Sequence, residues 1–169
     1  MQADGLTDAE VNNLKSLMPT VTMLCSKLSS YGIKQTIVQP DCNPNNMLVT
    51  SDSQKITIID LGEIAITHPF FSLLNYMFVL KKRHGLIEED DRYHQIKDAC
   101  LKSFLNTVPY KQLEEAWGIA QKLWFVYDVL AQFRFIHACG KEKIMSFQPG
   151  KLSHTLRDFM VRAAAVEIR

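Results

Sequence analysis

The chain has 169 residues, of which 47% are hydrophobic and 22% are charged, a composition typical of a soluble globular protein. Its length favours a single domain over residues 1–169 with a substantial hydrophobic core. The formal net charge of +1 gives no electrostatic indication of a nucleic-acid or anionic membrane partner, so neither is expected.

Four cysteines, Cys25, Cys42, Cys100 and Cys139, stand far apart in the sequence and form no C-x-x-C pair. This spacing disfavours structural zinc and thioredoxin-like chemistry, and it predicts free thiols in a reducing compartment. The sequence shows neither a secretory signal nor an apolar run as long as a membrane span. Together these observations predict a cytoplasmic protein.

The first expected element is a long helix that follows residues 1–6. Thr7 and Glu10 have the spacing of a capping box, and apolar residues then recur at helical intervals as far as Leu28. Pro19 is expected to kink or split this helix, and Gly32 to end it. Residues 36–38 then predict a short buried strand.

A β-hairpin is expected next. Residues 46–50 and 55–59 predict two strands joined by the polar turn 51–54. Asn46 begins the outgoing strand and Asp60 follows the returning one, so antiparallel pairing brings these positions close together.

The remaining sequence has helical periodicity. We expect helices over residues 70–83, 88–106, 109–139 and 152–168, separated by turns at Gly85, Gly140 and 148–150. The predicted fold class is therefore α+β, mainly helical, with a small antiparallel β-hairpin.

Asp41, Asn46 and Asp60 are the candidate functional residues. Carboxylate and amide oxygens are the hard ligands that Mg²⁺ prefers, and phosphoryl transfer needs mainly positioning and charge neutralisation. In this interpretation Asp41 is the catalytic acid/base for an attacking hydroxyl. Asn46 and Asp60 are the metal ligands, and they hold the phosphates of ATP through the metal ion.

The segment Gln39-Pro40-Asp41-Cys42-Asn43-Pro44-Asn45-Asn46, with Ile58-Ile59-Asp60 after a hairpin, carries a family resemblance. It resembles the catalytic loop of aminoglycoside phosphotransferases and choline-kinase-like small-molecule kinases, whose pattern is H-G-D-x-H-P-x-N followed by a hairpin and I-I-D. The resemblance covers about residues 36–74.

This resemblance implies the C-terminal lobe of a protein-kinase-like fold, with the catalytic loop at 39–46. It implies that Asp41 is the catalytic aspartate, Asn46 the metal-binding asparagine and Asp60 the metal-binding aspartate after the hairpin. The implied activity is transfer of a phosphoryl group from ATP, with Mg²⁺, to a hydroxyl of a small-molecule acceptor. The acceptor itself has no sequence motif.

The chain departs from the family pattern at four positions. Gln39 stands where the family has His, and Asn43 stands where it often has a second His. His68 and Ser72 stand where two aspartates are expected. These four positions usually support the loop, whereas the three central groups are intact.

The sequence also lacks the motifs of an N-terminal nucleotide lobe. The seven glycines are scattered, so there is no Gly-rich loop, and no V-A-I-K-like strand precedes Gln39. We therefore expect a truncated domain, a C-terminal lobe that is inactive in isolation. Its expected partner is the missing N-terminal lobe or a protein that covers the same docking surface.

Three alternatives remain open. A non-catalytic, pseudokinase-like binding module would show the same residues and would engage a partner through apolar surface. The run from Asp41 to Asp52 partly matches an EF-hand calcium loop, although Asn46 stands where that loop needs Gly. The loop could also be a plain turn in an unrelated helical domain, because Asn, Asp and Pro favour turns.

Two further clusters have both a functional and a structural interpretation. The acids at 88–91 either face a cationic acceptor or occupy the first turn of a helix, where acids are favourable. Trp117, Trp124 and Tyr127 share helical spacing, which is typical of a core more often than of an aromatic cage. Asp128 and Arg134 interrupt the same apolar helix.

Overall fold

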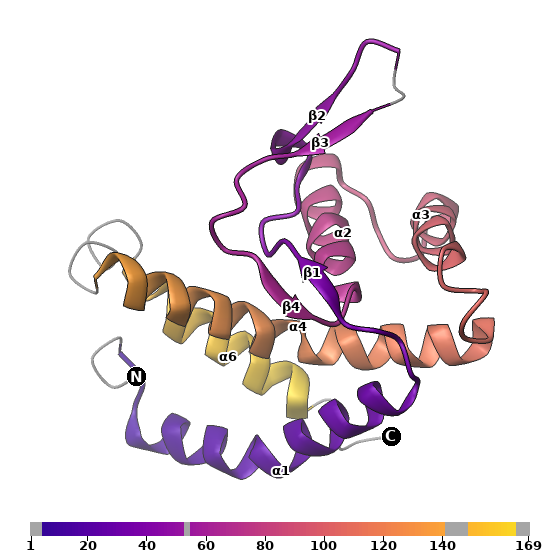
Figure 1. Cartoon of the computed structure of the whole chain (residues 1–169). Coiled ribbons are helices and arrows are strands. Elements are labelled where there is room, and N and C mark those ends of the chain that lie inside the picture. The colour runs from indigo at the N-terminus through magenta and orange to yellow at the C-terminus, as the bar shows by residue number, and fades with distance from the viewer. Residues whose placement is uncertain (1–4, 53–54, 141–148, 165–169) are drawn as a thin grey trace. The chain divides into compact units, whose positions relative to one another are not determined.

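The computed structural model describes residues 5–52, 55–140 and 149–164 (Figure 1). The described residues are mainly helical, with two small antiparallel sheets, which confirms the α+β class. The elements are, in chain order, α1 (Asp8–Ser30), β1 (Thr36–Val38), a 3₁₀ helix (Pro44–Asn46), β2 (Met47–Val49), β3 (Ile56–Ile58), β4 (Ala65–Thr67), α2 (Phe70–His84), α3 (Asp91–Lys102), α4 (Tyr110–Cys139) and α6 (Lys151–Ala164). Within this described part, no helix has the length and apolar character that crossing a membrane requires.

The described residues form two compact units. Unit 1 comprises the described residues within 1–30 and 118–169, and unit 2 comprises those within 31–117. The expectation of one domain over the whole chain stays a prediction. Asp41, Asn46 and Asp60 all belong to unit 2, so the candidate site is built within a single unit.

Helix α1 begins with the expected capping box. The Thr7 backbone N–H donates to Glu10 Oε2 at 2.8 Å, and the Glu10 backbone N–H donates to Thr7 Oγ1 at 3.2 Å. Arg157 Nε of α6 donates to Glu10 Oε1 at 2.6 Å. The hydrogen bond from Arg157, followed by the one from Thr7, lowers the pKa of Glu10 to about 2. Helix α1 is not split at Pro19, which lies inside it.

The core of unit 1 lies between helices. Helix α1 and helix α6 pack together, and α6 also lies alongside the part of α4 that belongs to this unit (Figure 1). The apolar stripe of α1 is buried at helical spacing, which is how an amphipathic helix contributes to a core. Its members are Leu14, Leu17, Val21, Leu24 and Leu28. Residues 165–168 of the expected last helix lie outside the described residues.

Unit 2 contains both sheets. Strand β1 pairs with β4, with Ile37 opposite Ile66, and β2 pairs with β3, with Met47 opposite Ile58. The expectation of a buried strand at 36–38 is wrong except for Val38, because Ile37 is 67% exposed. Strand β4 was not predicted, although Ala65–Thr67 carries two β-branched residues, which favour strands. Residues 53 and 54 of the expected hairpin turn lie outside the described residues.

Aromatic packing fixes the start of α2 in unit 2. Phe70 is fully buried, and its ring lies 5.3 Å from Phe104 and 5.4 Å from Trp117, measured between ring centroids. Trp117 is therefore a core residue rather than part of a cage. Helix α2 ends where Gly85 adopts a φ of 63°, in the left-handed region that Gly enters without strain.

Helix α3 is shorter than the expected span 88–106 because turns replace both of its ends. Asp90 is its N-cap residue and Asp91 opens its first turn, a placement that suits the helix dipole. Glu88 precedes the helix and forms an ion pair with Lys81 of α2. Their positions agree with the structural interpretation of the acidic run at 88–91.

We predict that Thr7→Ala lowers the free energy of unfolding by about 1 kcal/mol, because it removes the side-chain oxygen that caps the first turn of α1. Urea unfolding at neutral pH measures this change. Thr22→Ala in the same helix is the matched control, since the Thr22 hydroxyl only donates to the Met18 carbonyl one turn earlier. Equal losses in the two variants would contradict the capping role.

Candidate functional site

The candidate catalytic loop leaves β1 and turns through a short 3₁₀ helix into β2. Asn43 caps that helix, and its Oδ1 accepts from the Asn45 backbone N–H at 2.9 Å. Pro44 occupies the first helical turn, where a backbone N–H would have no partner within the helix, so the lack of an N–H in proline costs no hydrogen bond. The loop is thus a structured turn that delivers Asn46 to the first position before β2.

The Asp41 carboxylate is held by two side-chain amides. Asn43 Nδ2 donates to Asp41 Oδ1 at 2.7 Å, and Asn46 Nδ2 donates to Asp41 Oδ2 at 2.8 Å. The same two nitrogens also donate to the Asp41 backbone carbonyl, at 3.2 and 2.9 Å. Backbone and side chain of Asp41 are therefore oriented together, and the carboxylate stays exposed.

Asp60 follows the returning strand of the hairpin. The Ile59 backbone N–H donates to the Asn46 carbonyl at 3.0 Å, which extends the β2–β3 ladder by one residue. Asp60 follows immediately, with a φ of 58°, and its side chain is exposed. Asn46 and Asp60 thus sit at the same end of the ribbon, and the side chain of Asn46 turns toward Asp41 rather than away from it.

Helix α2 anchors the loop on both sides of Asp41. Ser72 Oγ accepts from the Gln39 backbone N–H at 2.9 Å and donates to the Gln39 carbonyl at 3.1 Å. Asn75 Nδ2 donates to the Cys42 carbonyl at 3.2 Å. Ser72 and Asn75 are three residues apart and face the same side of the helix. The sequence offered no signal for the role of Asn75.

The surrounding structure excludes one alternative. An EF-hand loop is flanked by helices, whereas this loop lies between strands β1 and β2. The coincidental-turn interpretation expected Asn46 and Asp60 to point away from Asp41, and the hydrogen bond from Asn46 to Asp41 opposes it.

The donor set suits magnesium that also binds phosphate. Both N–H directions of Asn46 are used on Asp41, which leaves its Oδ1 as an available ligand, and the Asp60 carboxylate is exposed at the same end of the ribbon. Mg²⁺ commonly takes one or two protein oxygens and completes its shell with water and substrate phosphates. Within the described residues, no group of three or more His, Cys, Asp or Glu side chains could hold a metal ion by itself.

His68 and two thiols near the loop have shifted pKa values. His68 is 7% exposed, and burial lowers its pKa to about 4, so the imidazole is neutral at pH 7. Its Nδ1 accepts from the Phe70 backbone N–H at 3.3 Å, and its Nε2 is buried with no hydrogen-bond partner among the described residues. Burial raises the pKa of the Cys42 and Cys100 thiols, which makes them poor nucleophiles.

A polar cluster lies in unit 1, between α4 and α6. Gln132 Nε2 donates to Asp128 Oδ2 at 2.8 Å and to Thr155 Oγ1 at 3.2 Å. Burial raises the pKa of Asp128, while the charge of Lys151 and the Gln132 hydrogen bond oppose that shift. Phe125 and Tyr127 of the same helix are buried, as a core requires.

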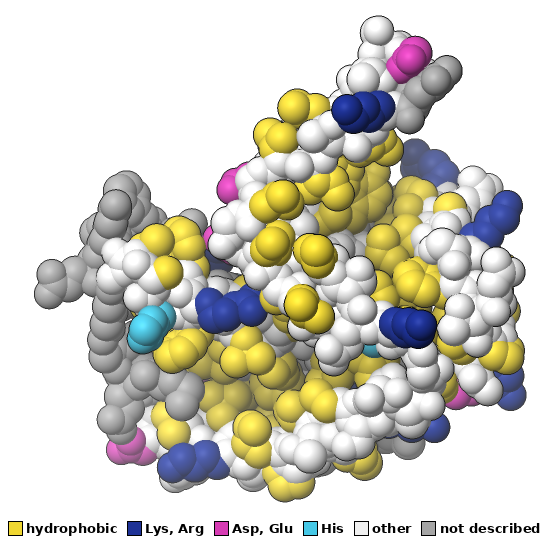
Figure 2. Space-filling model, viewed as in Figure 1, with side chains coloured by type: hydrophobic (Ala, Val, Ile, Leu, Met, Phe, Trp, Pro, Cys, Tyr) yellow, Lys and Arg dark blue, Asp and Glu magenta, His cyan; other side chains and the backbone are white. Residues whose placement is uncertain are grey.

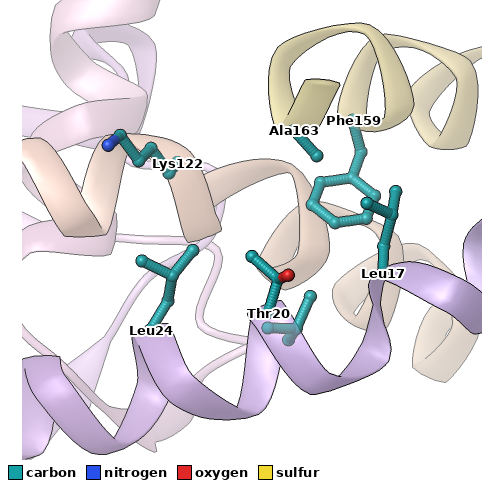
Figure 3. Close-up of a pocket in the computed structure, with 7 residues that line it drawn as sticks. Leu17, Thr20, Leu24, Lys122, Phe159 and Ala163 are labelled. Carbon is teal, nitrogen blue, oxygen red and sulfur yellow. The ribbon is translucent and has the colours of Figure 1, made fainter. Parts of the chain in front are cut away.

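A small hollow also lies in unit 1, between α1, α4 and α6 (Figure 3). Its volume of about 10 Å³ holds at most one water molecule, so it cannot admit a nucleotide or a sugar. None of the candidate site residues lines it. The lining residues are Leu17, Thr20, Val21, Leu24, Lys122, Phe159 and Ala163.

Comparison of this chain with protein-family models, with curated proteins and with solved structures finds no match. The assignment of Asp41, Asn46 and Asp60 therefore depends on their spacing and geometry.

We predict that native stability declines as the pH falls from 6.5 toward 4. The unfolded chain protonates His68 near its ordinary pKa of 6.5, whereas the folded chain does so only near 4, so protons favour unfolding across that window. Urea midpoints measured from pH 7.5 to 4.5 should fall less steeply in His68→Gln than in the wild type. His84→Gln, at an exposed site at the end of α2, should keep the wild-type slope.

Proposed function

We propose that this chain is the C-terminal lobe of a small-molecule phosphotransferase of the aminoglycoside phosphotransferase and choline-kinase-like type. It acts with ATP and Mg²⁺ on a hydroxyl of a small-molecule acceptor. The observation that carries the proposal is the pair of hydrogen bonds from Asn46 to Asp41, at the ribbon end where Asp60 follows β3. The helical fold with a small hairpin supports a protein-kinase-like lobe.

In this proposal Asp41 orients the acceptor hydroxyl and takes its proton. Its two carboxylate oxygens each receive one amide hydrogen bond, which leaves lone pairs for a third donor. The amide donors fix the carboxylate without neutralising it. An oriented carboxylate next to the attacking oxygen is what proton transfer requires.

In this proposal Asn46 and Asp60 position the phosphates of ATP through a bound metal ion. Asn46 Oδ1 and the Asp60 carboxylate are the residues that would bind Mg²⁺, and the ion supplies the positive charge that neutralises the transferring phosphoryl group. Asn46 joins the two halves of the site, because its nitrogen orients Asp41 while its oxygen is available to the metal. The sequence carries no Gly-rich loop to cover the phosphates, so we propose that turnover needs a second lobe.

We predict that phosphate transfer requires both aspartates. In a protein that joins this chain to an N-terminal nucleotide lobe, Asp41→Ala should lower kcat by about 10²–10⁴-fold, the usual contribution of a positioned acid/base. Asp60→Ala should abolish the Mg²⁺-dependent transfer, and Asp91→Ala, an exposed acid of α3, should change nothing. Transfer of labelled phosphate from ATP measures all three. Equal turnover in every variant would end the catalytic assignments, whereas rapid catalysis by the 169 residues alone would overturn only the need for a second lobe.

A non-catalytic binding module is the second candidate function, and exposed apolar surface in unit 2 favours it. Figure 2 shows hydrophobic side chains along the hairpin and the segments beside it. Isolated surface hydrophobics are ordinary, whereas contiguous ones indicate a binding surface. The exposed members on the four strands and their connections are Ile37, Leu48, Val49, Ile56, Ile58, Ile59, Leu61, Ile64 and Ile66.

We predict that this surface makes the isolated chain self-associate at high concentration. Ile66→Lys should shift the chain toward the monomer, because Ile66 is 75% exposed beside the exposed Ile37. Val161→Lys is the matched control, since Val161 is 72% exposed in unit 1. Sedimentation velocity measures the effect. A wild-type chain that is monomeric at every concentration would contradict the prediction.

A further inference from the structure

The Gln39 side chain is buried, with 5% of the residue exposed, and its amide points at the end of β3. Gln39 Nε2 donates to the Asp60 carbonyl and, at 3.5 Å, to the Ile59 carbonyl. Carbonyl oxygens only accept hydrogen bonds, so the amide nitrogen must be the atom that faces them. The bond joins the start of the catalytic loop to the backbone of a proposed metal ligand.

The burial of this amide indicates that the position needs a hydrogen-bond donor. Gln39 Oε1 is buried and has no hydrogen-bond partner within the described residues. An unsatisfied buried polar atom costs free energy, and an apolar side chain of similar size would avoid that cost. We therefore attribute the buried amide to the hydrogen bond that its nitrogen donates, rather than to the space that the side chain fills.

Ser72 holds Gln39 in place. Its hydroxyl accepts from the Gln39 N–H and donates to the Gln39 carbonyl, so one side chain binds both backbone groups of the residue. Ser72 lies in the first turn of α2, which the buried Phe70 and Phe71 fix in the core of unit 2. Gln39 is thus attached to a buried part of the unit.

Asp60 needs such support. Its φ of 58° lies in the left-handed region, which costs energy for a residue other than Gly and persists only where neighbours hold it. Within the described residues, its carboxylate makes no hydrogen bond, so the backbone, which sets the direction of the Cα–Cβ bond, is what limits where the carboxylate can reach. The hydrogen bond from Gln39 fixes the carbonyl of that backbone.

We infer that Gln39, clamped by Ser72, is a positioning residue that sets the direction of the Asp60 carboxylate toward the metal ion. The inference rests on the proposed function, because it assumes that Asp60 is a metal ligand. Gln39 and Ser72 are two of the positions where the chain departs from the family pattern, and they bond to each other. A neutral amide and a hydroxyl thus replace ionisable groups in supporting the loop.

Mn²⁺ binding to the 169-residue chain tests the inference, since Mn²⁺ takes the same oxygen ligands as Mg²⁺ and is paramagnetic. Water-proton relaxation should show weak binding by the wild type. Gln39→Met should bind about tenfold more weakly, the usual effect of losing a residue that orients a ligand. Gln39→His should restore most of the affinity, because an imidazole N–H can donate to the same carbonyl.

Matched variants separate positioning from packing. Gln95→Met makes the same chemical change at an exposed site on α3 and should leave binding unaltered. Ser72→Ala should weaken binding and Ser72→Thr, which keeps the hydroxyl, should restore it. Circular dichroism confirms that each variant folds. Unchanged affinity in folded Gln39→Met overturns the inference, and so does an equal loss in Gln39→His.

A second readout separates this inference from the proposed function. If the wild type binds no Mn²⁺, the metal role of Asp60 fails. The amide resonance of Leu61, whose nitrogen is bonded to the Asp60 carbonyl carbon, then reports the clamp without any metal. A shift of this resonance in Gln39→Met supports the clamp, and an unshifted resonance overturns it.

Discussion

The hydrogen bonds between Asn46 and Asp41 are the interaction on which the candidate site depends. One amide nitrogen binds both the carbonyl and the carboxylate of Asp41, so the path of the loop and the direction of its acid are set together. The carbonyl of Asn46 meanwhile accepts from Ile59, which ties the same residue to the returning strand. Loss of this asparagine would therefore release the acid from the ribbon that carries Asp60.

Local chemistry allowed much of the fold to be predicted from the sequence. The Thr7–Glu10 capping box, the glycine that ends α2 and the two strands of the hairpin all depend on neighbouring residues, and the structure confirms them. Strand β4 and the exposure of β1 could not be derived in this way. They depend on pairing between residues about 30 positions apart and on what covers each face, which periodicity does not encode.

The four departures from the family pattern also gain their roles only from contacts in the folded chain. Gln39, Asn43 and Ser72 are ordinary polar residues in the sequence, yet each forms a hydrogen bond in the loop. His68 instead packs against the Phe70 ring, with 4.7 Å between ring centroids, and its imidazole is neutral. The donors of these bonds are two amides and a hydroxyl, which do not titrate near neutral pH, so loss of a proton there does not remove them.

The β2–β3 hairpin links the two candidate functions, because it carries both the proposed phosphotransferase site and the apolar face proposed for partner binding. Met47, Val49, Ile56 and Ile58 share one face of the β2–β3 ribbon, because opposite residues in an antiparallel pair point the same way. A two-stranded ribbon is marginally stable unless something packs against it. Whatever covers that apolar face therefore also fixes the register of Asn46 against Ile59. Occupation of the surface and the geometry of the proposed metal ligands are then coupled through one short ribbon.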